Sequence, residues 1–226
     1  MSDAVLLREL ILIRHGESHG NVGTAGDEFI DIQDPLLTEN GFCQAECLGK
    51  MMGEEPDVIY TSGLRRAVLT AEGLSRHRTD DAPVYILPEL CEIGVSPDYP
   101  GLTIEEIRQL CPKAVMAPGT EENAKTVVGD ECTYEHEERY FKRAENVLNY
   151  IASQYNNGEK VALVSHAGFL TYVIFYLIGY RDAQPGYDFR LTNTGVSRIL
   201  FYEPGTNRYG DVIFDCVNER KHLEKY

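Results

Sequence analysis

Three short runs of consecutive apolar residues stand out along the chain, and each run ends abruptly at polar residues. The runs are Leu10–Ile13, Val58–Tyr60 and Val161–Val164. Segments of this length that are apolar on both faces are typical of strands buried in the middle of a parallel sheet. We therefore expect the three runs to be neighbouring parallel strands of one sheet.

Longer segments with apolar residues at helical spacing lie between or after these strands. We expect one helix to end near Met52, further helices at 64–77, 134–155 and 169–178, and shorter strands at 84–87, 196–202 and 211–216. Alternation of strands and helices is the pattern of an α/β fold. The length of 226 residues suits a single domain, 1–226, with a sizeable core.

Basic and nucleophilic side chains follow the three apolar runs closely. Arg14 and His15 come directly after the first, Arg65 and Arg66 shortly after the second, and His166 after the third. Open α/β sheets bind ligands at the carboxyl ends of their strands. Two imidazoles and two guanidiniums would converge there, and the planar fork of arginine matches the oxygens of phosphate. The pattern therefore predicts a phosphate pocket. Arg65 is expected to be a surface charge beside it, with contact between its side chain and the substrate as the alternative.

The motifs around these residues resemble those of the histidine phosphatase superfamily, the phosphoglycerate-mutase-like group. The matching segments are Arg14-His15-Gly16-Glu17 followed by Asn21, Arg66-Ala67 with Thr70-Ala71, and Ser165-His166-Ala167-Gly168. They occur in the family's order and span most of the chain. The resemblance implies an α/β three-layer sandwich, with a mostly parallel central sheet flanked by helices.

The resemblance also implies a role for each of these side chains. His15 would be the nucleophile that takes up the phosphoryl group as a phosphohistidine. Arg14 and Arg66 would clamp the phosphoryl oxygens, Arg66 being preferred to its neighbour because the family's arginine directly precedes alanine. His166 would donate a hydrogen bond to the transferred group, and Asn21 could donate another. This chemistry requires no metal ion and no cofactor.

Two glutamates are candidates for the acid that protonates the leaving group. The family places its glutamate after the third strand, ahead of a glycine and a helix. Glu92 lies nine residues before Gly101, close to the family spacing, and Glu89 lies twelve residues before it. The local turn, Tyr99-Pro100-Gly101, departs from the family pattern. We therefore prefer Glu92 and keep Glu89 as the alternative acid.

Two stretches without a clear period are predicted to be loops that set specificity. Gly20 and Gly23 begin a flexible segment that runs to Asp34, and we expect it to close over the site. The segment 112–132 contains proline, glycine and several acids, and we expect a long surface loop or lid there. It belongs to a predicted specificity insertion around 94–133.

Composition narrows the class of partner. A formal net charge of −15 argues against nucleic acid and anionic membranes. It is compatible with a small phosphorylated substrate, because surface charges are screened beyond about 8 Å at physiological salt and a local cationic pocket can still act. Six cysteines without a C-x-x-C pair argue against a zinc site and fit a reducing cytoplasm. Arg8 and Glu9 interrupt the first apolar run, so no signal peptide is expected.

We therefore interpret the chain as a metal-independent phosphatase for a phosphate monoester. A phosphoglycerate mutase would share these residues but would need further basic residues for the substrate carboxylate. The segment after Asn21 contains no Lys or Arg before Lys50, which favours hydrolysis. A non-catalytic relative that binds a phosphorylated partner is a third hypothesis, opposed by the intact pairs of histidines and arginines. A metal site built on His15 and His166 lacks a carboxylate motif at ligand spacing.

Overall fold

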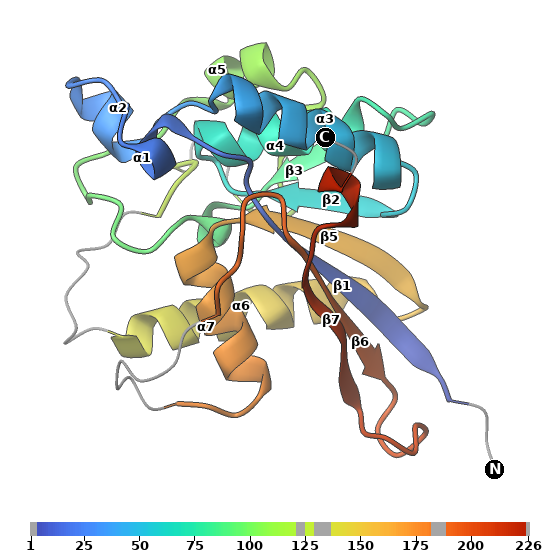
Figure 1. The fold of residues 1–226 in the computed structure, drawn as a ribbon. Helices are drawn as coiled ribbons and strands as arrows, with labels where there is room; N and C mark the ends of the chain where they lie inside the picture. Colours follow the sequence, from blue (N-terminus) through green and yellow to red (C-terminus); the bar gives the residue numbers. More distant parts are fainter. Residues whose placement is uncertain (1–3, 121–124, 129–136, 182–188, 225–226) are drawn as a thin grey trace.

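The computed structural model describes residues 4–120, 125–128, 137–181 and 189–224. A seven-stranded sheet in the order β4-β3-β2-β5-β1-β6-β7 crosses the molecule (Figure 1). Its strands are β1 (Leu6–Arg14), β2 (Val58–Thr61), β3 (Val84–Ile86), β4 (Ala114–Met116), β5 (Glu159–Ser165), β6 (Val196–Tyr202) and β7 (Val212–Glu219). All pairings among β1 to β5 are parallel, whereas β6 and β7 pair antiparallel.

Helices cover both faces of the sheet, which is the predicted three-layer α/β arrangement. On one face lie α3 (Glu39–Met52), α4 (Arg65–Ser75) and α5 (Ile104–Leu110), and on the other α6 (Glu137–Gln154) and α7 (Ala167–Leu177) (Figure 1). The short helices are α1 (His19–Val22), α2 (Phe29–Gln33), η1 (Pro88–Leu90) and η3 (Lys221–Leu223). Among the described residues, no helix combines the length and apolar character needed to cross a bilayer.

The alternation of side chains along β1 explains why helices are needed on both faces. Leu10 and Leu12 belong to the core under α6 and α7, while Ile11 and Ile13 belong to the core under α3 and α4. All four are at most 1% exposed. Burying each such side chain contributes roughly 1.5–3 kcal/mol. The first apolar run is therefore the centre of two hydrophobic cores at once.

The parallel pairing of β1 with β5 places two motifs that are distant in sequence side by side. Leu12 is opposite Leu163, and Arg14 is opposite Ser165. The residues after each strand, His15 and His166, therefore emerge from the same edge of the sheet. β2 pairs with β5 on its other side, which brings the turn into α4 to this edge as well.

Two segments predicted to be loops contain regular structure. The segment from Gly20 to Asp34 contains α2 and all of α1 except its first residue, and both helices are too short for hydrophobic periodicity to reveal. The continuous loop predicted from Pro112 is wrong at Ala114–Met116, where β4 pairs with β3 at the sheet edge. Three residues stabilised by backbone pairing leave no readable alternation in the sequence. The first turn of the predicted helix from Tyr134 lies outside the described residues, and α6 is described from Glu137.

The first turn of α3 packs directly against the backbone of the turn after β1. A Cβ at Gly41, in the first turn of α3, would overlap the carbonyl oxygen of Glu17. We expect Gly41→Ala to lower the free energy of unfolding by about 1–3 kcal/mol, since the backbone would have to shift. Cys43→Ala, at an exposed position of the same helix, is the matched control. Urea denaturation of both variants checks this, and equal stability of the two would contradict it.

Candidate active site

Two buried histidines face each other at the ends of β1 and β5. The ring centroids of His15 and His166 are 5.0 Å apart, with an angle of 55° between the planes. His15 is 3% exposed and His166 is 0% exposed. The backbone N–H of His15 donates to the carbonyl of Ser165 at 2.9 Å, so the strand ladder continues to the first histidine. Strand register therefore determines how far apart the two imidazoles stand.

The hydrogen bond of His15 specifies which of its ring nitrogens has a free lone pair. Nδ1 lies 2.7 Å from the carbonyl oxygen of Gly16. A carbonyl only accepts, so Nδ1 carries the proton and Nε2 keeps its lone pair. Burial, followed by the charges of Arg66 and Arg14, lowers the pKa of His15 well below its ordinary value of 6.5. At neutral pH, His15 is thus a neutral imidazole with an available nucleophilic nitrogen.

His166 is hydrogen-bonded through one ring nitrogen, and its other ring nitrogen has no partner among the described residues. Its Nε2 lies 2.9 Å from the hydroxyl of Ser62, in the turn between β2 and α4. Its Nδ1 is buried and has no hydrogen-bond partner among the described residues. Burial, then the charges of Arg66 and His15, lower the pKa of His166 well below 6.5. A neutral ring with one unsatisfied buried nitrogen is a candidate ligand-binding group.

Two guanidiniums lie close enough to both histidines to act on their pKa values. Arg14 Nη1 donates to the carbonyl of Leu191 at 2.8 Å, and its buried Nε has no partner among the described residues. Arg66 is 7% exposed. Because both imidazoles are neutral, the charge of these four side chains resides on the two guanidiniums. Such a cluster suits the binding of a phosphoryl group, whose oxygens accept charge-assisted hydrogen bonds from arginine.

Asp34 anchors the arginine turn, a role that the sequence analysis missed. Its carboxylate is fully buried and accepts from the backbone N–H of Arg65 at 2.8 Å and from the hydroxyl of Tyr99 at 2.9 Å. Arg66 Nη1 lies 3.5 Å from the same group. The prediction of Arg65 as a surface charge is wrong, since its side chain is 12% exposed and pairs with Asp31. Local sequence patterns could not reveal that Arg65 is buried, because its contacts join residues about thirty positions apart.

Asn21 is placed beside the histidine turn by its side-chain oxygen. That oxygen accepts from the backbone N–H of Ser18 at 3.1 Å and from Asn193 Nδ2 at 3.0 Å. Asn193 Nδ2 also donates to the carbonyl of His15 at 3.0 Å. The side-chain nitrogen of Asn21 remains available within the described structure. Asn193 was not identified from the sequence, because it lies outside every recognised motif.

The two candidate acids have different surroundings. Glu92 accepts hydrogen bonds from the backbone N–H of Phe169 at 2.9 Å and of Gly168 at 3.3 Å, in the first turn of α7. Its charge raises the pKa of Arg14, opposing the larger effect of burial, so Glu92 lies near the site. Glu89 has a buried Oε2 without a hydrogen-bond partner among the described residues. Both glutamates therefore remain candidates.

A third arginine contributes charge near His166. Arg143, on α6, is 7% exposed, and its guanidinium carbon lies 4.4 Å from the ring centre of Phe169. Its charge helps to lower the pKa of His166, after burial and the charges of Arg66 and His15. Its burial could have been predicted from the sequence, because Arg143 precedes Val147 by four residues and so lies on the apolar face of the helix.

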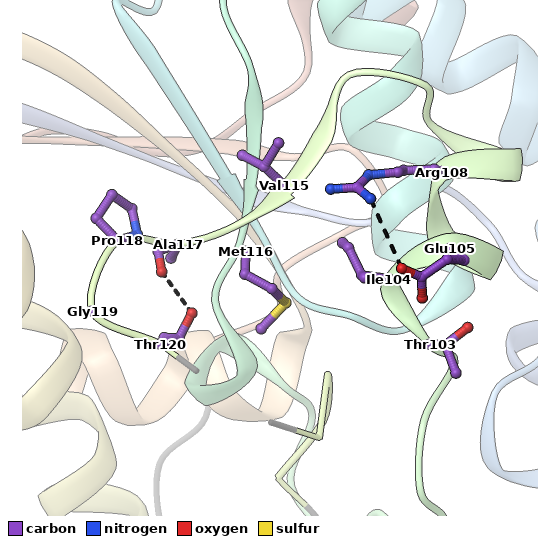
Figure 2. Close-up of a pocket in the computed structure, with 10 residues that line it drawn as sticks. All are labelled: Thr103, Ile104, Glu105, Arg108, Val115, Met116, Ala117, Pro118, Gly119 and Thr120. Atoms are coloured by element: carbon purple, nitrogen blue, oxygen red, sulfur yellow. Dashed lines mark hydrogen bonds and ion pairs between the residues drawn. The ribbon is translucent and has the colours of Figure 1, made fainter. Parts of the chain in front are cut away.

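A cavity of 560 Å³ opens elsewhere, between α5 and the end of β4 (Figure 2). Its polar side chains satisfy the protein's own groups: Arg108 donates to Ala114 O at 3.1 Å, and Thr120 donates to Ala117 O at 2.6 Å. None of the predicted site residues lines it. Across the described ranges, no group of three His, Cys, Asp or Glu side chains is arranged to hold a metal ion. The histidine pair with its arginines is therefore the candidate site.

The lowered pKa values of the two histidines predict how stability depends on pH. An unfolded histidine titrates near pH 6.5, whereas the folded pKa values are lower, so the unfolded chain binds more protons as pH falls below about 6.5. Stability should therefore decrease from about pH 7 to about pH 5. His166→Gln should show a shallower decrease in urea denaturation, because one linked group is gone. Parallel pH profiles for wild type and variant would contradict this.

The curated proteins that resemble this chain in sequence match only part of its length. The 2,3-bisphosphoglycerate-dependent phosphoglycerate mutase of Bartonella henselae is 38% identical over 106 residues, 45% of this chain and 50% of that protein. The mutase of Corynebacterium jeikeium is 46% identical over 65 residues, 27% of this chain and 24% of that protein. The chain thus spans about half the length, or less, of the curated relatives it matches.

Solved structures match over nearly the whole chain. YhfR of Bacillus stearothermophilus is 28% identical with a TM-score of 0.62, covering 96% of this chain and 100% of that one. The phosphoserine phosphatase of Entamoeba histolytica, solved with 3-phosphoglyceric acid, is 24% identical with a TM-score of 0.62 and the same coverage. The family model of the histidine phosphatase superfamily (branch 1) matches residues 10–209. With this match added to the paired histidines and their arginines, the chain belongs to the histidine phosphatase superfamily.

Proposed function

We propose that the protein is a metal-independent phosphatase that hydrolyses a small phosphate monoester through a phosphohistidine on His15. One observation carries the proposal. Nδ1 of His15 donates to the carbonyl of Gly16, so Nε2 presents its lone pair beside a cluster of positive charge. An uncharged nucleophile next to fixed cations suits attack on a phosphate dianion.

In the first step, His15 Nε2 attacks phosphorus and the bond from phosphorus to the leaving oxygen breaks. Arg14, Arg66 and His166 bind the remaining phosphoryl oxygens while charge is redistributed among them. The departing alkoxide takes a proton from a carboxylic acid, assigned to Glu92 with Glu89 as the alternative. In the second step, the resulting carboxylate removes a proton from water, which attacks phosphorus, breaks the P–N bond and releases phosphate.

Hydrolysis is favoured over mutase activity by what surrounds the site. A mutase must hold a substrate carboxylate as well as the phosphoryl group. The segment from Gly20 to Asp34, which includes α1 and α2, contains no Lys or Arg. The relatives named as mutases match along half of their length or less, so their activity does not extend to this chain as a whole. Mutase activity is the second candidate because those relatives carry that name.

The nucleophile assignment predicts the effect of one substitution. With a chelator present, wild type should release phosphate from an aryl phosphate, and His15→Ala should lower kcat by at least about 1,000-fold, because the covalent route is gone. His77→Ala, which removes a histidine paired with Glu46 at the end of α4, should leave the rate unchanged.

Each other outcome of this assay points to a different hypothesis. Equal activity of wild type and His15→Ala would refute the phosphohistidine mechanism. Activity abolished by the chelator would contradict its independence of metal. If wild type is inactive on aryl and alkyl phosphates but interconverts phosphoglycerates, the mutase alternative is correct. Binding of inorganic phosphate without any turnover would favour a non-catalytic relative.

The dependence of kcat on the leaving group identifies which glutamate is the acid. A proton donor matters most when the leaving group is a poor one. Glu92→Gln should therefore reduce kcat by about 100-fold or more for an alkyl phosphate, and by less for a nitrophenyl phosphate. Glu89→Gln serves as the matched comparison and should affect both substrates equally. Reversal of the two patterns would transfer the assignment to Glu89.

A further inference from the structure

Ser62 connects the turn after β2 to the imidazole of His166. Its side chain is fully buried, and its hydroxyl oxygen lies 2.9 Å from His166 Nε2. The same oxygen accepts a hydrogen bond from the backbone N–H of Leu64 at 3.2 Å. The backbone N–H of Ser62 donates to Val164 O at 3.0 Å, in the strand that carries His166. These backbone contacts therefore fix the position of the hydroxyl next to the ring.

The direction of the bond from the Ser62 hydroxyl to His166 follows from counting protons. A hydroxyl has one proton to donate, and one lone pair of Ser62 already accepts from Leu64. Among the described residues, His166 Nε2 is the acceptor that the hydroxyl reaches. A buried O–H without an acceptor is costly, so we infer that the Ser62 proton points to Nε2 and that Nε2 is unprotonated. A neutral imidazole carries a single N–H, so that proton is on Nδ1.

We propose that Ser62 is a positioning residue that selects the Nδ1–H tautomer of His166 and thereby makes its buried, unsatisfied Nδ1 a hydrogen-bond donor to the transferred phosphoryl group. The two facing histidines then have complementary roles. His15 offers a lone pair at Nε2, and His166 offers a proton at Nδ1. The catalytic consequence rests on the proposed phosphatase function, whereas the tautomer assignment does not.

The opposite tautomer would work against catalysis. With the proton on Nε2, His166 would present a lone pair from Nδ1 to an anionic phosphoryl oxygen. One hydrogen bond to the developing charge would be replaced by repulsion. Loss of one preorganised donor to such a charge typically costs about 100- to 1,000-fold in kcat. A buried hydroxyl that excludes the unproductive tautomer is therefore useful even though it does not touch substrate.

The first test uses wild-type protein and needs no activity. Long-range ¹H–¹⁵N correlation spectra at neutral pH distinguish a protonated from an unprotonated ring nitrogen. We expect Nδ1 of His166 to be protonated and Nε2 to be unprotonated, and addition of inorganic phosphate should shift the Nδ1 resonance. A protonated Nε2 in wild type would overturn the proposal, whether or not the protein is a phosphatase.

The second test removes the hydroxyl. Ser62→Ala should give a mixture of His166 tautomers and lower kcat/KM for an aryl phosphate by about 10- to 100-fold, part of the effect of losing the donor. Ser75→Ala is the matched control, because Ser75 is also buried and donates to Glu72 O at 3.1 Å within α4. An unchanged tautomer in Ser62→Ala would overturn the proposal.

The two measurements also separate this inference from the proposed function. If wild type shows the Nδ1–H tautomer but releases no phosphate from any ester, the phosphatase proposal fails and the tautomer assignment stands. A large loss of rate in Ser62→Ala with an unchanged tautomer would mean that Ser62 acts through packing, which contradicts selection of the tautomer. Ser62→Thr, which keeps the hydroxyl, should retain the wild-type ring pattern and restore activity towards the wild-type rate.

Discussion

Parallel pairing of β1 with β5 is the interaction on which the site depends. The two strands lie at the centre of the sheet and bury apolar side chains against helices on both faces. Their register sets Arg14 opposite Ser165, so the residue after each strand is a histidine at the same edge. A slip of one residue would turn every side chain of the strand to the opposite core. The hydrophobic pattern that stabilises the fold therefore also aligns the two imidazoles.

Burial of several basic groups close together has an electrostatic cost. Water is excluded from both rings, and the charges of Arg66 and Arg14 disfavour protonation of either histidine. Asp34 is the buried carboxylate that contacts Arg66 directly. The remaining positive potential is what a phosphate dianion would neutralise. Under the proposed function, binding of the phosphoryl dianion would offset the cost of burying these cations.

Much of the fold could be predicted from the sequence because the three long-range partners β1, β2 and β5 each contain a short apolar run that ends at polar residues. The placement of His15 and His166 followed from the rule that ligand sites lie at the carboxyl ends of parallel strands. The anchoring of the arginine turn by Asp34 could not be predicted, because it depends on contacts from several segments that meet only in the folded chain. Arg143 was missed for a different reason: a basic residue on an apolar helix face is usually taken as a break in the pattern, whereas here it packs over an aromatic ring.

The hydrogen bond between Tyr99 and Asp34 has an implication for how this protein could diversify. Tyr99 belongs to a turn predicted to contribute to substrate choice, and it donates to the same carboxylate that contacts Arg66. Under the proposed function, this contact would couple recognition of the variable part of a substrate to the binding of its phosphoryl group by Arg66. A change of this turn that displaced the tyrosine would also loosen the arginine. New specificities should arise more readily from sequence changes that leave this one hydroxyl in place.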